Sequence, residues 1–119
     1  MHEYAITENL IEIVSEELKK HNSKKLTTVN LVVGEISSII PECIELYFEA
    51  LVRNTELQDA KLKFETIPAE LKCSSCGKLF KKTKNKLECP ECGEIGVFTD
   101  KGKEFYIESI EIEDFKDLK

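Results

Sequence analysis

The chain has few of the features that mark several large classes of protein. No run of apolar residues is long enough to span a membrane. The start of the chain lacks the basic-then-apolar pattern of a signal peptide, so we expect a cytoplasmic protein. No nucleophile is patterned with a base, and no paired carboxylates suggest an organised pocket. An enzyme is therefore the least expected class for these 119 residues.

Basic charge is also scarce. The chain holds 17 lysines and arginines against 23 acids, a net charge of −6. Residues 72–103 are the exception, since eight of the lysines fall there against four acids. Such an acidic body disfavours nucleic-acid binding, which rests on neutralising phosphates. We read the lysine run 81–86 as a solvated hairpin, with contact to an acidic partner as the lesser interpretation. No membrane partner is expected.

Four of the five cysteines form two pairs with twelve residues between them. The pairs are Cys73-Ser-Ser-Cys76 and Cys89-Pro-Glu-Cys92, and each is followed by a glycine. Two residues between thiolates allow a tight turn that directs both sulfurs at one point. Two such turns facing each other make a closed tetrahedron suited to Zn²⁺. The spacing therefore predicts a metal site made of four cysteines.

Other uses of these cysteines fit the pattern less well. A single redox-active cysteine pair would need no second pair, and no βαβ pattern surrounds these residues, so disulfide and thioredoxin-like chemistry are disfavoured. Iron, held as in a rubredoxin-like electron carrier, competes with zinc as the metal. A zinc ribbon that binds nucleic acid is a further alternative, but only Phe80 and Phe98 could stack on bases there. The fifth cysteine, Cys43, is expected to be a small buried side chain, and His21 a surface cap.

The remaining pattern predicts two helices and three strands. Apolar residues at helical spacing run from Ile6 to Leu18 and include Ile13. A second helix is expected to begin at Pro41, with Ile44, Tyr47 or Phe48, and Leu51 on its apolar side. The expected strands are 26–33, 62–67 and 105–112. In the first of them Val29, Leu31 and Val33 alternate with Thr28, Asn30 and Val32.

These elements predict an α+β fold. Two helices would pack on a three-stranded sheet, with a small four-cysteine, zinc-ribbon-like lobe inserted before the last strand. We expect one body made of residues 1–70 and 104–119, and a metal-binding lobe made of residues 71–103.

The first three residues offer a second set of metal donors. The amine of Met1, the amide nitrogen of His2 and its imidazole can close adjacent chelate rings on one ion. Glu3 can add its amide nitrogen or its carboxylate. Four such donors in a plane suit Ni²⁺ or Cu²⁺. The amine must lose its proton to bind, so binding should strengthen with pH. Taken alone, a histidine at position 2 is weak evidence for such a site.

The motifs taken together resemble a known family. They are the start Met1-His2-Glu3-Tyr4-Ala5-Ile6, the segment Val33-Gly34-Glu35-Ile36-Ser37 with Pro41-Glu42 after it, the cysteine pairs, and Glu108-Ser109-Ile110-Glu111-Ile112. In this order they resemble the HypA/HybF family, the nickel-insertion accessory proteins of [NiFe]-hydrogenase maturation. The likeness covers essentially the whole chain. One departure is Ala5, where many members carry serine, although no ligand role attaches to that position.

The resemblance implies a nickel metallochaperone. His2 would be the essential nickel ligand, together with the Met1 amine and the backbone nitrogens of His2 and Glu3. The four paired cysteines would hold structural zinc. Nickel would pass to the hydrogenase large subunit, with the GTPase HypB as a partner. Family members include monomers, dimers and domain-swapped forms, so a homodimer stays open.

Overall fold

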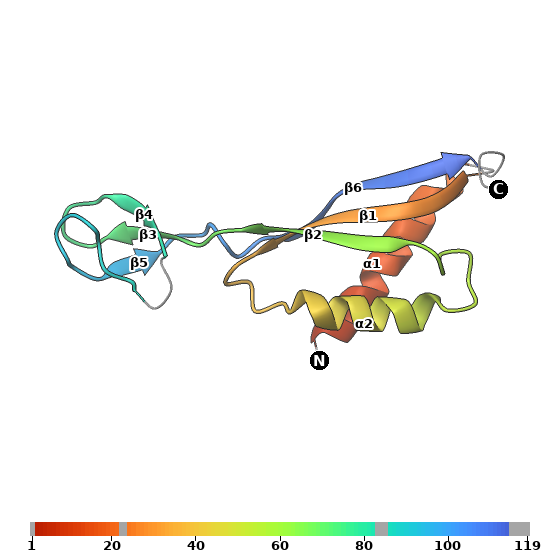
Figure 1. The fold of residues 1–119 in the computed structure, drawn as a ribbon, viewed down its shortest axis with the longest axis horizontal. Helices are drawn as coiled ribbons and strands as arrows, with labels where there is room; N and C mark the ends of the chain where they lie inside the picture. Colours follow the sequence, from red (N-terminus) through yellow and green to blue (C-terminus); the bar gives the residue numbers. More distant parts are fainter. Residues whose placement is uncertain (1, 22–23, 83–85, 115–119) are drawn as a thin grey trace. The chain divides into compact units, whose positions relative to one another are not determined.

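The structure, a computed structural model, describes residues 2–21, 24–82 and 86–114. Its elements, in chain order, are α1 (His2–Lys19), β1 (Lys24–Gly34), α2 (Pro41–Val52), β2 (Lys61–Ile67), β3 (Glu70–Cys73), β4 (Leu79–Lys81), β5 (Gly96–Phe98) and β6 (Phe105–Asp114). Figure 1 traces these elements along the chain. The expected α+β class is confirmed, with the cysteine-rich segment placed before the last strand.

The strands form two sheets, of order β2-β1-β6 and β4-β3-β5. The chain separates into two compact units. We call residues 1–31, 39–65 and 107–119 the helical unit, and residues 32–38 and 66–106 the cysteine unit. The predicted lobe, residues 71–103, falls within the cysteine unit, whose bounds are wider. In the described part of the chain, no helix is long and apolar enough to cross a membrane.

The core of the helical unit is built on residues four apart in α1. Leu10, Val14 and Leu18 are buried, as a helix with 3.6 residues per turn requires of one face. Ile13 was predicted to share this face, but its side chain is 51% exposed. The reason is geometric. Successive residues on a helix lie about 100° apart, so Ile13 is rotated away from the buried face on which Leu10, Val14 and Leu18 lie.

Helix α2 begins where the chain predicts. Pro41 occupies the first turn, where its missing N–H costs nothing and its φ is already helical. Ile44 and Phe48 are buried as predicted. The third buried residue of this face is Val52, whereas the sequence predicts Leu51. The ring of Tyr47 meets that of Tyr4 edge-on at 5.3 Å between centroids, which links α2 to the start of α1.

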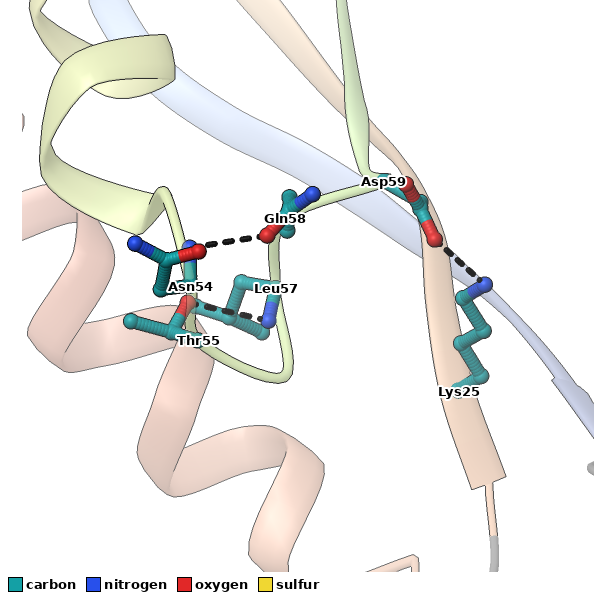
Figure 2. A network of polar contacts seen from close by, with 6 residues as sticks. All are labelled: Lys25, Asn54, Thr55, Leu57, Gln58 and Asp59. Carbon is teal, nitrogen blue, oxygen red and sulfur yellow. Dashed lines mark hydrogen bonds and ion pairs between the residues drawn. The ribbon is translucent and has the colours of Figure 1, made fainter.

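The turn after α2 is held by side chains rather than by a glycine. Figure 2 shows the Oγ1 of Thr55 accepting a bond from the amide of Leu57 at 3.1 Å. The same hydroxyl donates to the carbonyl of Val52 at 2.6 Å, so it satisfies one of the last helical carbonyls. Lys25 of β1 pairs with Asp59 at 2.9 Å (Figure 2). The segment that leads into β2 is thus tied to β1.

The sheet of the cysteine unit packs around Leu71, which is fully buried. Leu71 is opposite Phe80 on β4 and Phe98 on β5. Gly96 makes this packing possible, because a Cβ there would lie 2.6 Å from the Phe80 ring. The absence of a side chain at Gly96 therefore lets an aromatic ring cover this small sheet.

The segment Val33-Gly34-Glu35 has a structural role in the cysteine unit. The Gly34 amide donates to the Glu104 carbonyl at 2.7 Å, and a Cβ on Gly34 would overlap the Gly102 carbonyl. The carboxylate of Glu35 accepts a bond from the Ala69 amide at 2.8 Å. These contacts tie together segments that lie more than thirty residues apart in the sequence.

Candidate metal sites

The structure brings the four paired cysteines together. The sulfur atoms of Cys73, Cys76, Cys89 and Cys92 all lie within 4.8 Å of one another. Cys76 is 3.8 Å from Cys89 and 3.9 Å from Cys92, while Cys73 is 3.2 Å from Cys92. Four sulfurs at roughly 2.3 Å from a tetrahedral Zn²⁺ lie about 3.8 Å apart. The cluster therefore fits one tetrahedral ion held by four thiolates.

The first cysteine turn is closed by two backbone bonds. The amide of Cys73 donates to the carbonyl of Lys78 at 2.8 Å, and the amide of Gly77 donates to the carbonyl of Cys73 at 3.1 Å. Gly77 has a φ of 76°, a conformation that a side chain would resist. The glycine after the pair thus lets the chain turn back while both sulfurs face the same side.

The second turn repeats this geometry. The amide of Cys89 donates to the Glu94 carbonyl at 2.8 Å, that of Gly93 donates to the Cys89 carbonyl at 2.9 Å, and Gly93 has a φ of 79°. An ion pair between Lys78 and Glu91, 2.8 Å apart, joins the two turns on the surface. Equivalent turns that face each other are what a closed four-sulfur site needs, since each contributes two ligands from the same backbone conformation.

The two cysteines of each pair differ in burial. Cys73 and Cys89 are 2% and 3% exposed, whereas Cys76 and Cys92 are exposed. The amides of Ser75 and Cys76 both approach the sulfur of Cys73 at 3.4 Å. The first cysteine of each pair is therefore anchored in the interior, and the second closes the site from the solvent side.

The crowded thiols do not all ionise easily. The Cys76 amide donates to the Cys73 sulfur and thereby lowers the pKa of Cys73 to about 6. At Cys92, a bond from the backbone amide of Glu94 favours the thiolate, but the bond from the Cys92 thiol to the Cys73 sulfur and the partial loss of solvent outweigh it and raise the pKa of Cys92 to about 12. One thiolate thus forms first and hinders the others. A divalent cation removes that conflict, because it neutralises the charge that the sulfurs accumulate.

Of the residues predicted to supply nickel donors, His2 and Glu3 begin α1. Met1 and the His2 side chain are outside the described residues, so their geometry stays a prediction. Glu3 is described. Its carbonyl accepts a 2.6 Å bond from the buried hydroxyl of Thr7, and its carboxylate accepts a longer bond, 3.4 Å, from the amide of Ile40. Sequence reasoning missed both partners, although a threonine four residues after Glu3 was a usable signal.

No other metal-ligating group is gathered in the described part of the chain. The four paired cysteines are the one set of three or more histidine, cysteine or acidic side chains close enough to hold an ion there. Cys43 is half-buried on α2, and His21 is exposed just beyond α1. Neither belongs to that set, and Cys43 is less buried than the sequence predicts.

Comparison with known proteins gives consistent matches. The family described as "Hydrogenase/urease nickel incorporation, metallochaperone, hypA" matches residues 1–112. A protein named hydrogenase maturation factor HypA, from Caldanaerobacter subterraneus subsp. tengcongensis, is 44% identical over 114 residues, which covers 95% of this chain and all of that protein. A protein of the same name from Dehalococcoides mccartyi strain 195 is 35% identical and 96% of each chain is covered.

Solved structures of proteins named HypA also match the chain. The solution structure of the Ni metallochaperone HypA from Helicobacter pylori matches with a TM-score of 0.60 at 26% identity, covering 94% of this chain and 97% of that one. A second solution structure, of a HypA protein, matches with a TM-score of 0.65 at 28% identity, covering 94% and 96%. Sequence and fold therefore lead to the same group of proteins.

Proposed function

Because this chain belongs to the HypA family of nickel-incorporation metallochaperones, which are not enzymes, we propose that it binds Ni²⁺ at its own N-terminus and delivers it to a [NiFe]-hydrogenase. The ion is cargo, taken up and released again. The four paired cysteines hold a second metal, Zn²⁺, which stays in place and stabilises the cysteine unit. The zinc that stays and the nickel that is passed on are thus bound by different residues.

The position of α1 supports the nickel site. The helix begins at His2, and the first amides of a helix have no acceptor within it. Deprotonating the amides of His2 and Glu3 to bind a metal therefore breaks no helical hydrogen bond. The Met1 amine and the His2 imidazole complete the donor set. Glu3 adds its backbone nitrogen or its carboxylate; the bond that the carboxylate accepts from the Ile40 amide favours the backbone nitrogen.

The chemistry of the two donor sets supports this division. Four thiolates around one tetrahedral ion leave no open position, so exchange is slow and the site suits a structural metal. Nitrogen donors at a chain end leave an approach for a receiving protein. Of zinc and iron, zinc fits a cysteine site that needs no redox change.

The partners are part of the same proposal. We propose that the GTPase HypB acts with this protein and that the hydrogenase large subunit receives the nickel, both in the cytoplasm. A homodimer is one form in which the chain could work. Within the chain, residues 1–70 and 104–119 form the nickel-binding body, and residues 71–103 form the zinc-binding lobe. The family description, which joins nickel incorporation to hydrogenase, supports this assignment.

The test is a nickel titration by calorimetry on untagged protein. We expect about one equivalent of Ni²⁺ to bind the native chain. His2→Ala should abolish that binding, and so should a Gly-Ser extension before Met1, which removes the terminal amine from the chelate. His21→Ala is the matched control, since the same side chain is removed from an exposed position just beyond the far end of α1. Nickel binding that is unchanged in His2→Ala would rule out the proposed site.

A further inference from the structure

The outer face of the β4-β3-β5 sheet carries aliphatic side chains where polar ones are expected. A sheet with one face in the core usually alternates apolar and polar residues. Here Leu71 and Cys73 face the core, and the alternate residue, Lys72, faces out. Its neighbours across the sheet are Leu79 on β4 and Val97 on β5. The outer face thus has an aliphatic side chain on each side of a central lysine.

These aliphatic side chains are well exposed. Leu79 is 54% exposed, Val97 is 62% exposed and Ile95 is 64% exposed. Ile95 lies just before β5 and continues its extended backbone in a bridge to Glu88, so the alternation of side chains places it on the same face as Val97. We call Leu79, Lys72, Val97 and Ile95 the outer row. Three exposed branched aliphatic side chains are thus gathered on one face of a small sheet, and such apolar groups are the material of protein–protein contacts.

A hollow lies beside the outer row. It has a volume of about 300 Å³ and is lined by Lys72, Cys73, Ser74, Val97, Phe98 and Thr99. The hollow is largely open to solvent, so a side chain of a bound protein can enter it beside Val97 and Lys72, which are among its lining residues. The outer row therefore offers both a flat apolar contact and a recess for one side chain.

Charge indicates what would bind. Lys72 has no ion pair among the described residues, whereas Lys78 pairs with Glu91 and Lys103 with Asp100. The stem of Lys72 can lie along the aliphatic row while its ammonium stays free to bind an anion. A carboxylate flanked by apolar side chains complements this arrangement. A second copy that docked through the same face would bring Lys72 of one copy close to Lys72 of the other, and the two like charges would repel each other.

We propose that the outer row is a docking surface for an apolar segment of another protein that carries a carboxylate at its centre. The apolar side chains of that segment cover Leu79, Val97 and Ile95. Its carboxylate pairs with Lys72. This surface lies within the cysteine unit, so the inference stands or fails independently of the nickel donors at Met1 and His2.

The test uses the full zinc-loaded chain and two fluorescein-labelled peptides, Leu-Val-Glu-Val-Leu-Ser and the same peptide with lysine in place of glutamate. Binding is followed by fluorescence anisotropy. We expect the native chain to prefer the glutamate peptide by at least tenfold. Lys72→Glu should reverse that preference, and Lys72→Gln should remove it. Val97→Ser and Leu79→Ser should each weaken binding of the glutamate peptide about tenfold.

The controls separate docking from folding. Leu46→Ser removes an aliphatic side chain that is 66% exposed on α2, in the helical unit, and should leave binding unchanged. One zinc per chain, measured by mass spectrometry, shows that each variant keeps its cysteine unit. The proposal is overturned by equal or undetectable binding of both peptides, or by a preference that survives Lys72→Glu. Concentration-dependent self-association that Val97→Ser abolishes would also overturn it, since a second copy would then cover the row.

Discussion

Replacing Gly34 by alanine tests whether close backbone packing holds the cysteine unit together. An added Cβ would overlap the Gly102 carbonyl, and backbone cannot move aside as a side chain can. Two hydrogen bonds depend on this approach: Gly34 to Glu104 at 2.7 Å and Ile36 to Gly102 at 2.8 Å. Each contributes about 1 kcal/mol, and overpacking adds about 1–3 kcal/mol. We therefore expect Gly34→Ala to lower the free energy of unfolding by roughly 3–5 kcal/mol.

Gly77→Ala is the comparison. Nothing lies within 4 Å of a Cβ at that position, but its φ is 76°. The cost there is backbone strain alone, about 1–2 kcal/mol. Guanidinium unfolding of the zinc-loaded proteins, followed by far-ultraviolet circular dichroism, gives both free energies. Gly34→Ala should also lower the melting temperature by roughly 10–20 °C. If Gly34→Ala costs no more than Gly77→Ala, the close approach at Gly34 does not stabilise the unit.

Three further predictions concern the zinc site and the helical unit. Cys89→Ser should lose the zinc and the native NMR signals of the cysteine unit, with zinc measured by mass spectrometry, because the buried first ligand of a pair is removed. Zinc uptake near pH 7 should release at least two protons, because the raised pKa values of Cys76 and Cys92 keep both thiols protonated before the metal binds. The affinity for zinc should therefore fall as the pH falls. Calorimetric titrations in two buffers of different ionisation enthalpy measure the number of protons released. Thr55→Val should cost about 1 kcal/mol in urea unfolding, because the amide of Leu57 loses its acceptor.

The sequence predicted best where local rules decide the structure. The two-residue spacing of the cysteine pairs sets the turn, and the turn sets the direction of both sulfurs, so a cluster could be predicted without any knowledge of the fold. The same holds for α1 and α2, whose buried residues follow from helical spacing. Ile13 shows the limit of that rule. A residue at the edge of the apolar face of a helix is buried or exposed according to which other elements pack against it.

Long-range contacts could not be predicted in the same way. β4 and β5 have three residues each, too few for an alternation to be recognised. Val32 was placed on the more polar side of its strand, yet it is only 2% exposed, so β1 buries both faces near its end. Gly34 and Glu35 read as part of a family motif. Their contacts with Gly102 and Ala69 depend on the folded chain, and no local pattern indicates them.

The central claim is that one chain keeps zinc and moves nickel at different residues. The most direct measurement is the metal content of untagged protein, by mass spectrometry, after loading with Ni²⁺ and again after dialysis against EDTA. We expect about one zinc and one nickel per chain after loading, and zinc alone after dialysis; His2→Ala should carry zinc alone at both stages. Nickel retained by His2→Ala, or nickel that displaces the zinc of the native chain, would contradict the account.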